Sequence, residues 1–348
     1  MLMNTTPIPE LMESRIEDRH TMKWLRNALQ SAITLEFSTL PPYLTALWSI
    51  KNETDPVAIS IREVVQEEMQ HMGFVCNMLT AIGGKPQIAG QVPEYPAKGL
   101  PGGVMPDLVV DIDGLSQDSL VTFMTIEQPE IDVMTGKRPD LWKPGGYSTI
   151  GEFYDAIAAA FKELKPTLTP VGQVIGPRTG WSITSLDSVQ RAINTIKEQG
   201  EGSSGKSPVD LDPSDWSHYY RFAEVQKGRE IVPVPGQKDK WMYGDQPLPF
   251  PDVWPVVKLP KGGYDRDRVL GAVSHLMDQF DKAYTALIDE LQNTWTNGDQ
   301  AALWRAIEAM FAMQEHALAL MKTPRYDGKG TYVPRWRYLA AEPQRRSS

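Results

Sequence analysis

Cysteine is nearly absent from this sequence, and histidine is scarce. Among the 348 residues there is one cysteine, Cys76, and there are five histidines. A single cysteine excludes an internal disulfide and any metal cluster held by several thiolates. If the protein binds a metal, the ligands must therefore come from Glu, Asp and the few His residues.

Net positive charge and long apolar runs are also missing. The formal net charge is -9 and the pI is about 5.2, so nucleic acids and anionic membranes are not expected as partners. No apolar run approaches the roughly 20 residues that span a bilayer, and residues 1–20 lack the basic-then-apolar order of a signal peptide. We therefore expect a soluble, cytoplasmic protein that acts on a small molecule or a metal, and whether it forms a homo-oligomer is left open.

Proline divides the chain into zones. Twenty of the 28 prolines lie between Pro86 and Pro260, so this middle part is not one continuous bundle. Long segments with apolar residues at helical spacing lie on either side of it. These segments are residues 21–51 and 56–82 before it, and residues 265–296 and 299–322 after it. The short links NETDP and TNGD join each pair into a predicted hairpin.

Two helical hairpins separated by a long connection match the topology of a ferritin-like four-helix bundle. The sequence thus predicts a mainly α fold with a long Pro- and Gly-rich insertion between the hairpins. The expected units are an N-terminal hairpin at 1–84, the insertion at 85–263, a C-terminal hairpin at 264–323 and a tail at 324–348. Shorter helices are expected within the insertion at residues 116–127, 149–164, 186–199 and 213–228.

Glu36 lies on the apolar stripe of the first predicted helix, between Ile33 and Leu40. An isolated buried charge is costly, so this carboxylate must be paired, protonated or bound to a metal. Pairing with a buried Arg or Tyr is the simpler alternative. Pro41 and Pro42 follow within two turns and predict a bend, which either accommodates packing or leaves room for substrate.

The second predicted helix carries Glu68 and His71 three residues apart. That spacing places both side chains on one face, together with the apolar residues Val64 and Val75. Bundle proteins use this Glu-x-x-His arrangement to bind iron or manganese. Alone it is more often a surface pair than a ligand pair, but its coincidence with Glu36 on the neighbouring helix favours a metal site.

A complete metal site needs further ligands, and the insertion offers them. The segment IKEQGEGSS contains Glu198 and Glu201, and the segment DWSHYYRF contains His218. His218 shares a helical face with Phe222 and Val225, so we expect it to point inward. There it serves either as a metal ligand or as a core histidine bonded to a carbonyl.

Other polar residues are secondary candidates. Glu152 and Asp215 are explained by helix capping, and His316 lies on a helix rich in Met and Ala. Whether any of these contributes a ligand is left open. Tyr43 and Tyr219 are expected to act beside the metal or in a substrate pocket.

The chain resembles the ferritin-like family of the iminophenyl-pyruvate dimer synthases, which act in bisindole pigment pathways. The segments that carry the resemblance are LEFSTLPPYLTALWSI, EEMQHMGFVCNMLTAIGGKP, FMTIEQPE, TIGEFYDAI, EQGEG and SHYYRF. It runs from about residue 21 to residue 230 and continues weakly through the last hairpin. The resemblance implies a ferritin-like bundle whose metal is held by Glu36, Glu68, His71, His218 and either Glu198 or Glu201. The long additional regions of the multidomain pigment synthases are missing, so their substrate does not carry over.

These observations predict a non-haem metal oxidase or oxygenase that acts on a small amino-acid-derived or aromatic metabolite in secondary metabolism. Iron is the expected metal, although carboxylate and imidazole ligands also suit manganese and copper. Open coordination positions would accept dioxygen or peroxide. Two alternatives are a metal-storage or metal-sequestering protein, which the Pro-rich insertion argues against, and a scaffold without metal.

Overall fold

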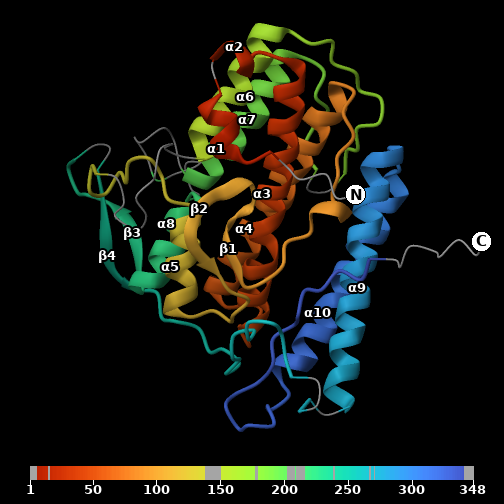
Figure 1. Cartoon of the computed structure of the whole chain (residues 1–348). Coiled ribbons are helices and arrows are strands. Elements are labelled where there is room, and N and C mark those ends of the chain that lie inside the picture. Colours follow the sequence, from red (N-terminus) through yellow and green to blue (C-terminus); the bar gives the residue numbers. More distant parts are fainter. Residues whose placement is uncertain are drawn as a thin grey trace, which may run out of the picture.

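The computed structural model describes residues 6–14, 16–137, 150–176, 179–201, 208, 216–237, 240–265, 268–269 and 271–340, without the side chains of residues 16, 17 and 201. Helices dominate it (Figure 1). The α-helices are α1 (Ile8–Glu13), α2 (Ile16–Arg19), α3 (Met22–Ser49), α4 (Pro56–Ala81), α5 (Gln117–Ile126), α6 (Ile150–Leu164), α7 (Leu186–Glu201), α8 (His218–Lys227), α9 (Gly271–Asn297) and α10 (Gln300–Met321). The 3-10 turns and strands are η1 (Ala89–Gln91), η2 (Pro101–Gly103), β1 (Ala97–Leu100), β2 (Val104–Val110), β3 (Arg229–Pro233) and β4 (Trp241–Pro247).

The long helices α3 and α4 form the predicted first hairpin at the centre of the molecule (Figure 1). Thr21 caps the N-terminus of α3, and its hydroxyl accepts a hydrogen bond from the backbone N–H of Trp24. Asp55 caps α4 in the same way, because its side chain accepts a hydrogen bond from the backbone N–H of Val57. Pro56 occupies the first helical position. Both caps satisfy backbone donors that the first turn of a helix leaves free.

Helix α3 continues through Pro41 and Pro42. Pro42 has no N–H, so the carbonyl of Ser38 lacks its usual partner four residues later. The hydroxyl of Tyr95 donates to that carbonyl at 2.7 Å and replaces the missing bond. The helix that carries Glu36 is therefore uninterrupted, and the bend expected at the prolines stays a prediction.

The middle of the chain folds back over the first hairpin. Helix α5 packs with α8 and helix α6 packs with α7, while α6 contacts α3, and α7 and α8 contact α4. The four short helices were predicted within a few residues, except that α8 begins at His218 rather than at residue 213. The antiparallel pairs β1–β2 and β3–β4 were not predicted.

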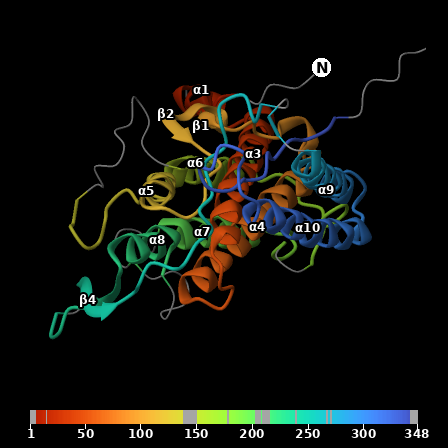
Figure 2. The same ribbon diagram turned by 90° about the horizontal axis from the view of Figure 1, so that it is seen from below.

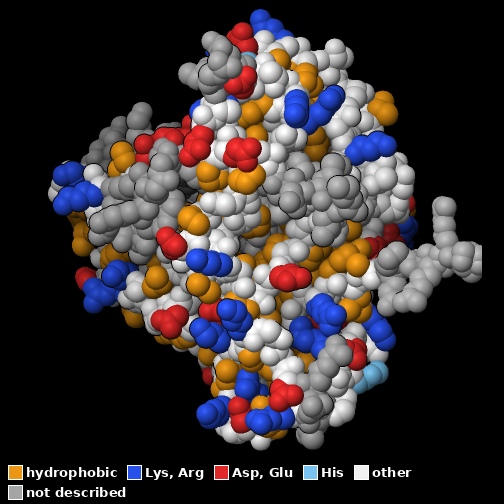
Figure 3. All heavy atoms as spheres, viewed as in Figure 1, with side chains coloured by type: hydrophobic (Ala, Val, Ile, Leu, Met, Phe, Trp, Pro, Cys, Tyr) orange, Lys and Arg blue, Asp and Glu red, His pale blue; other side chains and the backbone are white. Residues whose placement is uncertain are grey.

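The last hairpin, α9 and α10, packs against α3 on the side opposite α5 and α8 (Figure 2). One buried apolar core runs through all three parts of the chain, so α3 and α4 are covered on both sides. The unit boundaries at residues 84, 263 and 323 stay predictions. None of the described helices is both long and apolar enough to cross a bilayer. On the face seen in Figure 3, the acidic and basic side chains of the described residues are interspersed.

Candidate metal centre

Four helices bring acidic and imidazole side chains together in the interior. Glu36 comes from α3, and Glu68 and His71 come from α4. Glu127 is the residue at which α5 ends, and His218 is the first residue of α8. All five are buried or nearly so, and Glu127 has the most exposed side chain of the five, at 10%. We call these five residues the carboxylate–histidine cluster.

The cluster consists of two adjoining sets that share Glu68. The ligand atoms lie within 4.8 Å of one another in each set, which are Glu36, Glu68 and His71, and Glu68, Glu127 and His218. Nδ1 of His71 lies 3.4 Å from Oε1 of Glu68 and 3.5 Å from Oε2 of Glu36. Nδ1 of His218 lies 3.0 Å from the same Oε1 and 3.6 Å from Oε2 of Glu127. A carboxylate between two such sets has the position of a ligand that bridges two metal ions.

Each carboxylate of the cluster is fixed by a hydroxyl on its outer side. One oxygen accepts a hydrogen bond from this hydroxyl, and the other oxygen faces the imidazoles. The three pairs, donor first, are Thr39 and Glu68, Tyr43 and Glu127, and Tyr154 and Glu36. The inner oxygens are therefore held in place without being used in hydrogen bonds to these hydroxyls.

The two imidazoles are also held by a polar partner on their outer side. Nε2 of His71 lies 2.8 Å from Oε1 of Gln199, and Nε2 of His218 lies 2.9 Å from Oε2 of Glu67. When the proton is on Nε2, each imidazole donates outward, and its Nδ1 lone pair is available to a metal. Arg221, which is 3% exposed, pairs with Glu67 at 3.5 Å and keeps that carboxylate beside His218.

Burial and mutual charge control protonation in the cluster. Burial raises the pKa of Glu36 and of Glu127. Burial acts in the same direction on Glu68, but His218 and His71 hold its pKa well below the usual range. Burial alone would lower the pKa of His71, yet Glu36 and Glu68 raise it to about 10. A metal that binds here must therefore displace protons from the imidazoles.

The donor set fits a pair of divalent metal ions. Within the described residues, the carboxylates of Glu36, Glu68 and Glu127 form no ion pair with Lys or Arg, and their counter-ions are the imidazoles of His71 and His218, which a bound metal would replace. Nδ1 of His218 is buried and makes no hydrogen bond to a described group, although a Glu68 oxygen lies 3.0 Å away. Close approach without hydrogen-bond geometry is expected when ligand atoms converge on a shared cation. Carboxylate oxygens and imidazole nitrogens suit iron, manganese, copper and zinc.

A small cavity of about 40 Å³ lies beside the cluster. Its apolar wall is formed by Leu35, Ile126, Ile150 and Ile196. Lys197 also lines it, and the ammonium group of this lysine binds Asp155 at 2.6 Å. A volume of this size admits only a few molecules as large as water.

Comparison with known proteins identifies the family and the fold. A family model described as Ferritin-like matches residues 29–227, which include every residue of the cluster. The chain belongs to the Ferritin-like family. Its fold is similar to that of a crystal structure described as a ferritin-like protein from Caulobacter vibrioides, with a TM-score of 0.64 and 23% identity over 92% of this chain and 99% of that one. No curated protein matches the chain.

The Ferritin-like fold brings together four of the predicted ligands: Glu36, Glu68, His71 and His218. Glu198 is different, because it is half-buried on α7 and belongs to neither set. The next residue, Gln199, contacts His71 instead, since one step along a helix turns a side chain by about 100°. The side chain of Glu201 lies outside the described residues.

The secondary candidates do not enter the cluster. Glu152 on α6 and His316 on α10 belong to neither ligand set, and Asp215 lies outside the described residues. Tyr43 reaches the cluster through Glu127. Tyr219 follows His218 in sequence but packs edge-to-face on Tyr220 at 5.0 Å, and it belongs to neither ligand set.

Sequence reasoning missed three residues that act at the centre. Glu127 ends a helix and follows an apolar run, so no periodic pattern marks it as inward-facing. Glu67 was not among the predicted site residues, yet its carboxylate lies 2.9 Å from Nε2 of His218. Gln199 carries no charge and therefore gave no metal-ligand signal. The resemblance segments FMTIEQPE and EQGEG contain Glu127 and Gln199, and these segments were the available clue.

Proposed function

We propose that this chain is a non-haem metal-dependent oxidase or oxygenase, with iron bound at the carboxylate–histidine cluster. One observation carries the proposal: five side chains are each fixed on the outer side by a hydrogen bond, and their inner atoms converge on one buried space. Buried carboxylates and imidazoles whose outer atoms are held by hydrogen bonds in this way have the arrangement expected of metal ligands and their supporting residues.

Each residue around the cluster has a definable task in this reaction. A redox-active metal would supply the one-electron steps that dioxygen chemistry requires. Tyr43, Tyr154 and Thr39 orient the carboxylates, while Gln199 and Glu67 fix the imidazole tautomers. The apolar wall of the small cavity excludes bulk water, and its volume suits dioxygen or peroxide as the co-substrate.

The substrate class rests on the resemblance to the iminophenyl-pyruvate dimer synthases. It supports a small amino-acid-derived or aromatic metabolite and a role in secondary metabolism. Manganese or copper is compatible with the same ligands. The acidic composition favours small-molecule partners over nucleic acids or anionic membranes, and a cytoplasmic location stays an expectation.

Metal storage is the alternative function within a ferritin-like fold. A storage protein would take up metal beyond its ligand sites, whereas an enzyme of the proposed type saturates at about two ions per chain. The long insertion that folds over the first hairpin favours the enzyme, because a storage protein would be expected to keep a compact bundle without it.

Oxygen uptake by iron-loaded protein tests the proposal. Aromatic amino acids and their derived imines and 2-oxo acids would be supplied in turn, with native protein and Glu68→Ala compared at equal concentration. We expect substrate-dependent oxygen consumption by the native protein and at least a hundredfold lower rate in the variant. Iron uptake far beyond the ligand sites, with no substrate-dependent oxygen consumption, would favour storage.

A further inference from the structure

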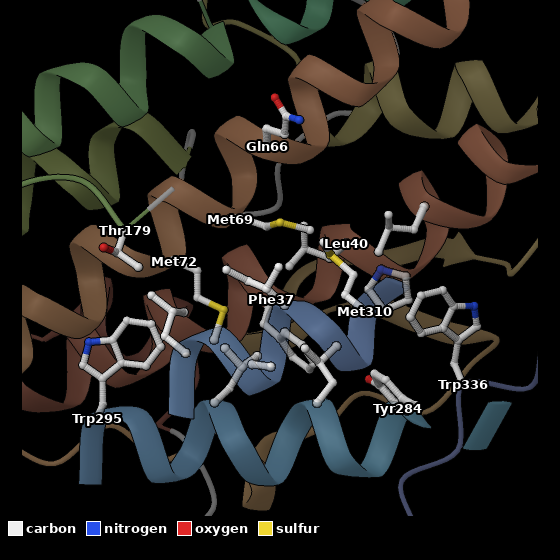
Figure 4. Close-up of a pocket in the computed structure, with 17 residues that line it drawn as sticks. Phe37, Leu40, Gln66, Met69, Met72, Thr179, Tyr284, Trp295, Met310 and Trp336 are labelled. Carbon is white, nitrogen blue, oxygen red and sulfur yellow. The ribbon is translucent and has the colours of Figure 1, made fainter. Parts of the chain in front are cut away.

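A second, larger cavity lies on the other side of the first hairpin. It has a volume of about 200 Å³ and lies between α3 and α4 on one side and α9 and α10 on the other (Figure 4). Met69 and Met72 of α4 and Met310 of α10 contribute flexible thioether side chains to its wall. Methionine adapts to ligands of irregular shape, so this wall can reshape around an apolar molecule.

This cavity is separate from the carboxylate–histidine cluster. On α4, Glu68 and His71 belong to the cluster, whereas Met69 and Met72 line the larger cavity. No described residue lines both this cavity and the small one beside the cluster. An occupant of the larger cavity would therefore be a second ligand, whatever reaction the cluster performs.

One polar group in the larger cavity lacks a partner. Tyr284 of α9 is fully buried, and its hydroxyl makes no hydrogen bond to any described group. Its ring packs edge-to-face against Trp336 at 5.2 Å, and the two side chains lie at the end of the cavity opposite Trp295 (Figure 4). A buried hydroxyl without a partner destabilises a fold, so such a group signals a missing hydrogen-bond partner.

The residues that line this cavity indicate what kind of ligand would bond to the Tyr284 hydroxyl. Trp295 and Trp336 offer aromatic surfaces at the two ends, and Leu287, Leu291 and Ile307 of the last hairpin are apolar. An aromatic molecule gains contact area with such a wall, and a single oxygen on it would satisfy Tyr284. We propose that this cavity binds a small aromatic molecule that carries one hydroxyl or carbonyl group, and that this oxygen hydrogen-bonds to the Tyr284 hydroxyl.

The proposal is tested by equilibrium dialysis with two probes, 2-naphthol and naphthalene, which differ by one hydroxyl group. Both should bind at one saturable site. Tyr284→Phe keeps the ring and removes the hydroxyl, so naphthalene affinity should stay unchanged. The preference for 2-naphthol over naphthalene should fall by roughly fivefold, which is the effect of one hydrogen bond.

Ala306→Phe fills the cavity from α10, where Ala306 is buried in its wall. It should weaken both probes at least tenfold while metal content and circular dichroism stay native. If this variant does not fold, the preference for 2-naphthol over naphthalene measured with Tyr284→Phe tests the proposal by itself. Absence of saturable binding, an unchanged probe preference in Tyr284→Phe, or full binding by a folded Ala306→Phe protein would each overturn the proposal.

Discussion

The rings of His71 and His218 stack 5.5 Å apart and 23° from parallel, and both Nδ1 atoms approach Oε1 of Glu68. The two residues are 147 positions apart and lie on different helices. Two unligated imidazolium ions would repel each other at this distance. The Glu68 carboxylate between them offsets this repulsion, and under the proposed function it would be the ligand that both metal-binding sets share, while Gln199 and Glu67 support the rings from outside.

The first prediction concerns Glu67, which supports His218. Glu67→Gln removes the charge that polarises the imidazole, so we expect metal affinity to fall by roughly tenfold to a hundredfold with little change in helicity. Competition with a chromophoric chelator measures this affinity.

Glu63→Gln is the matched control. Its carboxylate also binds Arg221, at 2.7 Å, but it is half exposed and does not contact His218. Equal losses of affinity in the two variants would mean that Arg221, rather than the Glu67–His218 contact, is the group that matters.

The second prediction is a pH-dependent stability from Glu224. Burial raises the pKa of this carboxyl to about 7, and Glu230 adds to the rise, although the N–H of Ile231 and the charge of Arg221 oppose it. The folded state therefore keeps a proton that the unfolded chain loses above its pKa of about 4.5, so the free energy of unfolding decreases as pH rises between these values.

Glu224→Gln removes this dependence while an amide oxygen can still accept from Ile231. Relative to native protein, the variant should gain up to about 3 kcal/mol more at pH 8 than at pH 4. Urea denaturation of both proteins at both pH values, with equal metal loading, measures the difference. A variant whose relative stability is the same at pH 4 and pH 8 would show that Glu224 titrates normally.

The third prediction is that Cys76 takes no part in the reaction. Its side chain is fully buried, and burial raises the pKa of the thiol well above its usual value, which disfavours the reactive thiolate. Cys76→Ala should keep full metal content and oxygen uptake with a small loss of thermal stability. A thiol reagent should label native Cys76 only as the protein unfolds, and fast labelling of folded protein would be inconsistent with its burial.

Helical periodicity explains how much of this centre could be predicted. Glu36, Glu68 and His71 lie within long amphipathic helices, where spacing alone places them on the buried face. Glu127 ends its helix at a loop, and Glu198 differs from Gln199 by one residue in register. Such positions depend on how the middle segment docks on α3 and α4, and local pattern does not contain that information.

The parts of the fold that were not predicted depend on packing between segments that are distant in sequence. The strands β1 to β4 are short, and their pairing involves bulges and proline, so alternation in the sequence is weak. The cavity at Tyr284 exists only because α9 and α10 dock on the far side of the first hairpin. Each hairpin was predictable by itself, but the space between them was not.

Metal content per chain is the most direct test of the cluster. Native protein, Glu68→Ala and Glu198→Ala would be reconstituted with Fe(II) without oxygen, desalted and analysed for iron, with circular dichroism on the same samples. Native protein and Glu198→Ala should bind about two ions per chain, because Glu198 is outside both ligand sets, and Glu68→Ala should lose most of the iron because it removes the shared ligand. Full iron content in a folded Glu68→Ala protein, or no iron in the native protein, would contradict the account.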